Sequence, residues 1–120
     1  MLILRFYETA NGRVPVEDFI KTLQKNEAAQ LVYDLRGVSN EFPNVKRVRV
    51  SHLRGKLWEI KIRLAKKNFR FIYAVEGKHL VILHGFIKKK GRAQDEIKTA
   101  ENRFKDYKNR VGRKESKETL

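Results

Sequence analysis

Residues 53–90 read LRGKLWEIKIRLAKKNFRFIYAVEGKHLVILHGFIKKK, and this stretch decides the fold. Apolar and polar residues alternate through LWEIKIRL and again through FRFIYAV, which is typical of strands that bury one face. The short polar segments at residues 65–68 and 76–77 predict tight turns between strands. The stretch therefore predicts three consecutive antiparallel strands, at residues 57–64, 69–75 and 78–87.

Most of the positive charge of the chain lies in and around this stretch. The 120 residues contain 28 Lys and Arg and 14 Asp and Glu, a formal net charge of +14. Residues 46–92 hold 15 of these cations and two acids, Glu59 and Glu76, so this segment alone carries +13. A sheet with such a charge favours a polyanionic partner, and RNA is the first candidate.

The composition restricts the class of protein. A length of 120 residues, 41% of them hydrophobic, predicts one folded domain at residues 1–111 and a disordered polar tail at residues 112–120. Because the chain has no cysteine, disulfides, thiolate catalysis and cysteine-ligated zinc are excluded, which fits the reducing cytoplasm. No run is apolar enough to span a membrane, and the N-terminus lacks the features of a signal peptide.

Helical segments flank the three strands. Residues 2–7 predict a first strand, and a helix begins at Pro15. A second helix follows a cap at Asn26, and its end is left open because the apolar pattern continues past Gly37. A last helix spans residues 93–110. The apolar faces of the three helices are Val16, Phe19, Ile20 and Leu23; Ala28, Leu31, Val32 and Leu35; and Ile97, Ala100, Phe104 and Tyr107.

The predicted element order is β-α-α-β-β-β-α, an α+β domain with an antiparallel sheet. The two N-terminal helices form a hairpin with one apolar side. Residues 78–87 are apolar on both faces, which predicts a central strand covered on both sides. Residues 45–50 (VKRVRV) alternate apolar and basic side chains and predict an edge stretch that extends the basic surface.

The turn at residues 65–68 sets the predicted register of the first hairpin. With four residues in the turn, Leu64 lies opposite Phe69 and Trp58 opposite Val75. All four side chains then share one buried face, which supports this register.

On the polar face the same register places Arg63 opposite Arg70, with Lys61 diagonal to Arg70. Like charges directly opposite each other cost stability. Either an anion sits between the two arginines, or the long side chains splay into solvent and Glu59 neutralises one of them.

Histidines offer a catalytic candidate but no metal site. With a two-residue turn at residues 76–77, His84 shares the face of Phe71 and is predicted to be a core or boundary histidine. A bulge or an odd-length turn reverses that prediction. His52 and His79 have no partners at the spacing of metal ligands.

Further cations lie in the loops. Those after the last strand form either a solvated charged loop or a phosphate-binding group beside the arginines, and the second interpretation is favoured. Those in the hairpin turn serve the same role or solubility alone. These candidate phosphate-binding residues are Lys88, Lys89, Lys90, Arg92, Lys66 and Lys67.

The segments LRGKLWEIKIRL, FRFIYAV, LVILHGFIKKK and RFKDY, in this order, resemble the phage-derived HigB-like branch of the RelE/ParE toxin superfamily. The resemblance spans residues 2–107 and is strongest at residues 53–89. It implies a RelE-like α+β toxin of a type II toxin–antitoxin pair, with no cofactor. HigB-like members cut mRNA on the translating ribosome, whereas members of similar fold poison gyrase without cleaving RNA.

The resemblance also implies residue roles and partners. In RNA-cleaving members, basic residues on the sheet bind and activate the scissile phosphate. The implied partners are a HigA-like, DNA-binding antitoxin, the ribosome and mRNA. The chain departs from the family where the loop reads KKKGRAQ instead of continuing with Thr and Pro, and where Ile97 stands near the place of a catalytic tyrosine. By position, phosphate activation falls to Lys61, Arg63, Arg70, Lys88 and Lys89.

Metal-free RNA cleavage uses the ribose 2′-OH as nucleophile and needs a base, cations on the phosphate and an acid. Arg63 and Arg70 suit charge stabilisation because arginine stays protonated. Lys61 is a candidate base, and Glu59 is the alternative unless it is paired with a neighbour.

Three functions follow in order of preference. The first is a metal-independent, ribosome-dependent endoribonuclease. The second is a gyrase-inhibiting toxin without catalysis, which the dense basic face disfavours. The third is a non-catalytic RNA-binding module, which is expected to expose aromatic side chains for base stacking.

Overall fold

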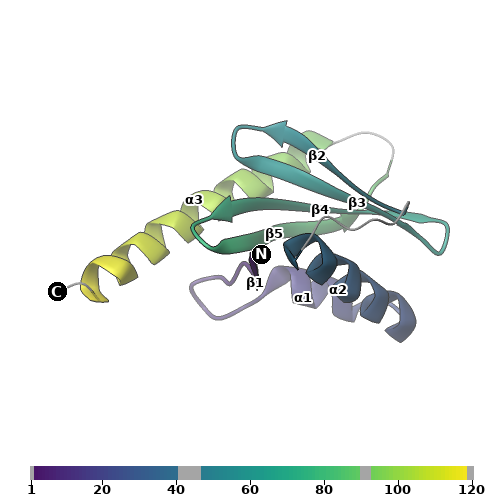
Figure 1. The fold of residues 1–120 in the computed structure, drawn as a ribbon, viewed down its shortest axis with the longest axis horizontal. Coiled ribbons are helices and arrows are strands. Elements are labelled where there is room, and N and C mark those ends of the chain that lie inside the picture. Colours follow the sequence, from purple (N-terminus) through teal and green to yellow (C-terminus); the bar gives the residue numbers. More distant parts are fainter. Residues whose placement is uncertain (1, 41–46, 90–92, 119–120) are drawn as a thin grey trace.

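The computed structural model describes residues 2–40, 47–89 and 93–118 and has an α+β architecture (Figure 1). These ranges contain five strands and three helices. In chain order the elements are β1 (Ile3–Phe6), α1 (Pro15–Lys21), α2 (Lys25–Asn40), β2 (Val48–Arg54), β3 (Leu57–Leu64), β4 (Lys67–Glu76), β5 (His79–Ile87) and α3 (Ala93–Glu118).

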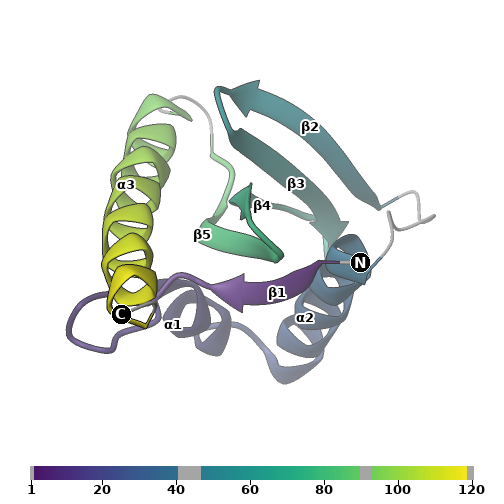
Figure 2. The ribbon, with the colours of Figure 1, turned by 60° about the vertical axis from the view of Figure 1, so that its left-hand side comes forward.

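The five strands form one sheet in the order β1-β5-β4-β3-β2. Helices α1 and α2 lie on one face and α3 lies on the other (Figure 2). Strand β1 runs parallel to β5, and the remaining pairs are antiparallel. The predicted element order and the fully antiparallel sheet are therefore wrong. The predicted order lacks β2 as a full strand. The predicted edge stretch at residues 45–50 is confirmed from Val48 onward, because β2 is an edge strand, while residues 45 and 46 lie outside the described residues. Periodicity does not reveal strand direction.

Each face of the sheet buries its own apolar core. Strand β5 contributes to both, and Val81, Ile82 and Leu83 have no exposed surface, which confirms it as an interior strand covered on both sides. The core under α1 and α2 includes Val16, Ile20, Leu31, Leu35, Ile60, Ile62, Phe69 and Phe71. The core under α3 includes Leu57, Ile72, Ala74, Val81, Leu83, Ala100, Phe104 and Tyr107.

The turn between β3 and β4 has two residues, not four. Ala65 and Lys66 both adopt the left-handed conformation, with φ of 51° and 63°, as a two-residue hairpin turn of matching twist requires. The register is therefore two residues from the predicted one, and Trp58 lies opposite Tyr73. A shift of two preserves the buried rows. Trp58, however, is 39% exposed instead of buried.

A β-bulge interrupts the pairing of β4 with β5. Ile72 lies opposite His84 and Tyr73 opposite Ile82, so one extra residue, Leu83, is accommodated in β5. The bulge turns His84 to the α3 face, and its predicted place on the face of Phe71 is wrong. Gly85 now faces Phe71, where a Cβ would lie 2.7 Å from the phenylalanine ring, so only glycine fits without a shift.

The helices follow their predicted apolar faces. Helix α2 continues through Gly37 to Asn40, with Val38 buried against the sheet. Helix α3 continues to Glu118, past its predicted end near Arg110. The domain boundary at residue 111 with a disordered tail stays a prediction. None of the described helices is both long and apolar enough to cross a membrane.

Candidate functional site

A row of cations crosses the α3 face of the sheet. Arg49 pairs with Lys61, and Lys61 pairs with Arg70, so three positive side chains lie next to one another on three neighbouring strands. On β5 the row ends at Phe86, which lies opposite Arg70. Helix α3 packs mainly on β4 and β5, and Arg49 on the outer strand β2 is exposed. We call Arg49, Lys61 and Arg70 the basic row.

A nearly buried carboxylate holds the basic row in place. Glu59 is 8% exposed, and its Oε1 accepts a hydrogen bond of 3.0 Å from Nη1 of Arg70. The same oxygen lies 3.9 Å from Nζ of Lys61. These contacts confirm the interpretation of Glu59 as an ion-pair partner. They also orient Arg70, whose side chain keeps 16% of its surface exposed, and Lys61, which keeps 41%.

Arg63 does not lie opposite Arg70 as predicted. The two-residue turn places Arg63 opposite Asn68, and its Nη1 donates a hydrogen bond of 3.0 Å to Asn68 Oδ1. Arg63 is therefore a diagonal neighbour of Arg70 at the margin of the basic row, at roughly 7–8 Å. Because Arg70 is paired with Glu59, its removal costs stability instead of relieving repulsion.

The other predicted cations lie around the row or away from it. Lys88 and Lys89 are exposed at the end of β5, and the backbone of Lys88 bonds to that of Asn68. Lys66 is exposed in the turn. Lys67 contacts Glu27 of α2 at 3.2 Å, on the α1/α2 side of the molecule. Lys90 and Arg92, both predicted to bind phosphate, lie outside the described residues.

A histidine–glutamate pair lies beside the β5 end of the basic row. The His84 imidazole is hydrogen-bonded through Nε2 to Oε2 of Glu96, in the first turn of α3. Its Nδ1 lies 3.1 Å from Nη1 of Arg103. Arginine only donates, so Nδ1 accepts and Nε2 carries the proton donated to Glu96. The His84 ring stacks on Phe86, with centroids 5.2 Å apart.

Burial lowers the pKa of His84, and the neighbouring Arg103 charge lowers it further, while the hydrogen bond and charge of Glu96 act in the opposite direction. The net direction is downward, so His84 is neutral at pH 7. The sequence does not predict this pair, because the bulge that brings His84 to this face has no signature in the sequence.

A family model described as phage-derived protein Gp49-like (DUF891) matches residues 18–105. The chain belongs to the phage-derived Gp49-like family. This family is part of the RelE/HigB-like toxin superfamily and is associated with toxins of toxin–antitoxin systems. No curated protein sequence matches the chain. The matched segment contains the basic row, Glu59, His84 and Glu96.

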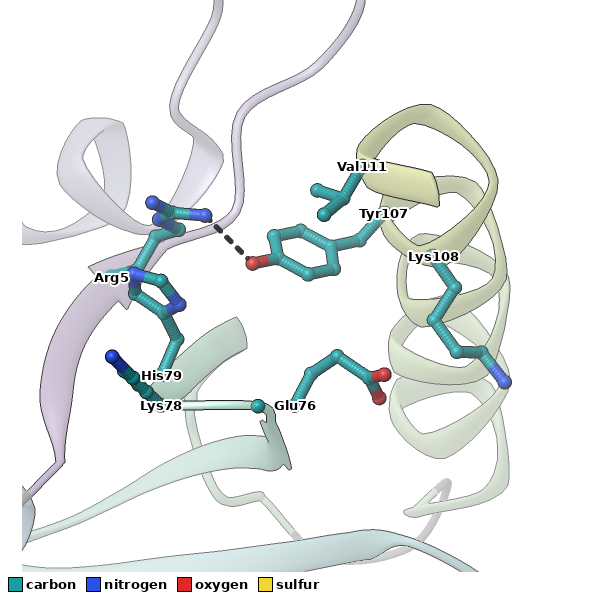
Figure 3. Close-up of a pocket in the computed structure, with 8 residues that line it drawn as sticks. Arg5, Glu76, Lys78, His79, Tyr107, Lys108 and Val111 are labelled. Atoms are coloured by element: carbon teal, nitrogen blue, oxygen red, sulfur yellow. Dashed lines mark hydrogen bonds between the residues drawn. The ribbon is translucent and has the colours of Figure 1, made fainter. Parts of the chain in front are cut away.

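This Gp49-like protein also has a pocket at the other end of α3, of about 370 Å³ (Figure 3). Nη1 of Arg5 donates a hydrogen bond of 2.9 Å to the Tyr107 hydroxyl beside it. The pocket shares no residue with the basic row. In the described part of the chain, no three His, Cys, Asp or Glu side chains gather as a metal site would require. The pocket lining is Arg5, Glu76, Gly77, Lys78, His79, Tyr107, Lys108 and Val111.

The unfolding free energy of the Gp49-like protein should depend on pH through His84. Its pKa is lower in the folded state than the unfolded value of about 6.5. The unfolded chain therefore binds more protons, and the stability that His84 contributes is present above pH 6.5 and is lost as pH falls through the folded-state pKa. Urea unfolding from pH 8 to pH 5 should show this loss. His84→Gln should flatten the profile, whereas the same change at the exposed His52 should not.

Proposed function

We propose that this Gp49-like protein is the toxin of a type II toxin–antitoxin pair, of the HigB-like branch. In this proposal it is a metal-independent endoribonuclease that cuts mRNA on the ribosome and thereby inhibits translation. The observation that carries the proposal is the basic row, set on an open part of the sheet with Arg70 oriented by Glu59. Membership of a toxin-associated family supports it.

The geometry suits phosphate activation. The Arg70 guanidinium and the Lys61 ammonium both meet Glu59 Oε1, at 3.0 Å and 3.9 Å, which holds the two cations close to each other. Two such cations stabilise the charge that develops on the phosphate oxygens as the 2′-oxygen attacks. Arg63 and Arg49 extend the positive surface along the RNA backbone. A ribosome that holds the message in place supplies orientation, which accounts for a large part of many rate enhancements.

The test is cleavage of one mRNA, with and without programmed ribosomes, followed by mapping of the new 5′ ends. Cutting is expected on programmed ribosomes and not in the matched free-RNA arm, whether or not EDTA is added to that arm. Efficient cutting of free RNA would contradict the ribosome-dependent mechanism. A single 2′-deoxy substitution at the cleavage site should stop the reaction. If neither arm is cut while toxicity persists, the activity belongs to the gyrase-inhibiting type.

Binding to the ribosome should depend strongly on salt, and Lys88 and Lys89 should contribute. Each phosphate contact adds roughly 0.7–0.9 to the slope of log affinity against log salt. The double Lys88→Ala, Lys89→Ala variant should weaken binding. It should also reduce the salt slope by the contribution of about one to two phosphate contacts. Cleavage at saturating ribosomes should change little, because contacts away from the scissile phosphate contribute mainly uniform binding. The paired control replaces the exposed Lys98 and Lys105 of α3; an equal slope change there would refute the assignment.

One observation favours a non-catalytic RNA-binding module as the second candidate. Trp58 is 39% exposed, and its ring packs against that of His52 with centroids 4.9 Å apart. An exposed aromatic ring suits base stacking. This candidate predicts that RNA binds without being cut. The wild-type protein would then retain full binding in the cleavage assay with no new 5′ ends.

The proposed partners are an acidic antitoxin, HigA-like and DNA-binding, together with the ribosome and mRNA in the cytoplasm. A chain of net charge +14 favours an acidic partner that covers the basic row. Expression in bacteria should therefore reduce colony counts, and co-expression of the neighbouring antitoxin gene should restore them. Equal counts with and without induction would contradict the toxin assignment.

A further inference from the structure

We propose that Glu96 is the general base of the site and that His84 is its positioning residue. This inference rests on the proposed endoribonuclease function. It differs from the assignment that the sequence favours, in which Lys61 or Glu59 takes the proton. Three features support the assignment: the position of Glu96, the exposure of its carboxylate, and the contacts that hold His84.

The position of the pair follows from the register. Phe86 lies opposite Arg70, and His84 lies opposite Ile72, two residues further along the same face of the sheet. His84 and Arg70 are thus diagonal neighbours on adjacent strands, a relation in which the two residue positions are roughly 7–8 Å apart. Glu96 reaches this point from the first turn of α3. A phosphate held by Arg70 therefore has Glu59 on its β3 side and the His84–Glu96 pair on its β5 side.

The carboxylates of Glu59 and Glu96 differ in how accessible they are to a substrate. Glu59 is 8% exposed, and its Oε1 is taken by Arg70. The side chain of Glu96 is 33% exposed. Its Oε2 is bonded to His84, while its Oε1 has no hydrogen-bond partner among the described residues. A general base needs a lone pair within reach of the substrate hydroxyl. Glu96 meets this need better, because its side chain is 33% exposed whereas that of Glu59 is 10% exposed and meets both Arg70 and Lys61.

His84 is held so that it fixes the carboxylate instead of competing for the proton. Arg103 bonds both to Nδ1 of His84 and to the carbonyl oxygen of Leu83, at 3.1 Å and 3.0 Å. The ring stacks on Phe86 from its own strand. With both nitrogens engaged, the neutral imidazole donates Nε2–H to Glu96 and sets its orientation. The charged group that interacts with Glu96 among the described residues is Arg103 on α3.

The reaction step balances with groups already placed. The 2′-oxygen forms a bond to phosphorus and gives its proton to Glu96 Oε1. The bond from phosphorus to the 5′-oxygen breaks, and its electron pair leaves with that oxygen. The leaving oxygen takes a proton from the Lys61 ammonium. Glu96 then gives its proton to water and Lys61 takes one from water, so both groups return to their starting states. The products are a 2′,3′-cyclic phosphate and a 5′-hydroxyl end.

The decisive variant is Glu96→Gln, which keeps an oxygen for the His84 N–H but removes the base. Single-turnover cleavage on programmed ribosomes should slow roughly 10²–10⁴-fold, with ribosome binding and thermal stability retained. The matched control is Glu101→Gln, which makes the same change on an exposed part of α3. A folded Glu96→Gln protein that cuts as fast as the control would overturn the base assignment while leaving the endoribonuclease proposal intact. An uncut message with the wild-type protein would overturn both.

A pair of His84 variants tests positioning. His84→Phe removes the donor to Glu96, and His84→Gln replaces it with an amide N–H. We expect kcat to fall with His84→Phe at unchanged KM, and to recover in part with His84→Gln. If the two variants lose activity equally and only in proportion to their loss of thermal stability, the role of His84 is structural and the positioning assignment fails.

Discussion

Replacing Arg70 with alanine is expected to abolish toxicity and to slow mRNA cleavage by roughly two to three orders of magnitude. Arg70 is the innermost cation of the basic row, on β4 between Lys61 on β3 and Phe86 on β5. Its guanidinium is already oriented by the 3.0 Å hydrogen bond to Glu59. A cation fixed in place before the substrate arrives stabilises the transition state without reorganisation, and alanine removes it entirely. Single-turnover cleavage and growth after induction measure the two effects.

The variant should also be less stable, by about 1–3 kcal/mol, because Glu59 would be left nearly buried without its hydrogen-bond donor. Adding Glu59→Gln should recover much of this stability but none of the activity. Arg54→Ala removes one charge from an exposed position on β2 outside the basic row, and it should retain toxicity. A folded Arg70→Ala protein with full toxicity would remove the basic row from the mechanism.

Phe71→Ala should have the largest effect on stability, roughly 3–5 kcal/mol. The Phe71 ring has no exposed surface, and it meets Phe19 of α1 edge-on with centroids 6.2 Å apart. The ring also occupies the space where a side chain at position 85 would lie, so a residue larger than Gly85 does not fit there without a shift. Urea unfolding should show the loss as a lower midpoint with an unchanged slope. Trp58→Ala removes a larger but 39% exposed ring and should cost less. Equal costs at the two positions would mean that the described core is wrong.

The sequence predicts much of this fold because periodicity reports burial. Spacing alone predicts the helix faces around Ile20, Leu35 and Phe104. Apolar residues on both faces predict that residues 78–87 form an interior strand. The sequence does not predict two local features, a turn and a bulge. Ala65 and Lys66 adopt left-handed backbone angles without the glycine or asparagine that usually marks such a turn. The bulge at Leu83 uses an ordinary apolar residue, and nothing in its side chain distinguishes it.

These two features explain the errors at the candidate site. The turn at Ala65 and Lys66 shifts the pairing of β3 with β4 by two residues. Arg70 therefore lies opposite Lys61 instead of Arg63, and a shift of two keeps these cations on their predicted face. The bulge moved the register by one beyond Leu83, and a shift of one exchanges the faces. The sequence therefore predicts the wrong face for His84. It also gives no sign that His84 meets Glu96, which lies in the first turn of a separate element, α3.

The pairing of the first strand with the fifth bears on how the molecule is made. Ile3 lies beside His79, so most of the chain must form before this contact is available. Contacts between residues far apart in sequence pay for loop closure before they return any stability, and such topologies fold slowly. During synthesis, the cations of β3 emerge well before β5 and α3, which supply Phe86, His84 and Glu96. A nascent chain therefore carries the charge early and acquires the complete face only when its last helix has been translated.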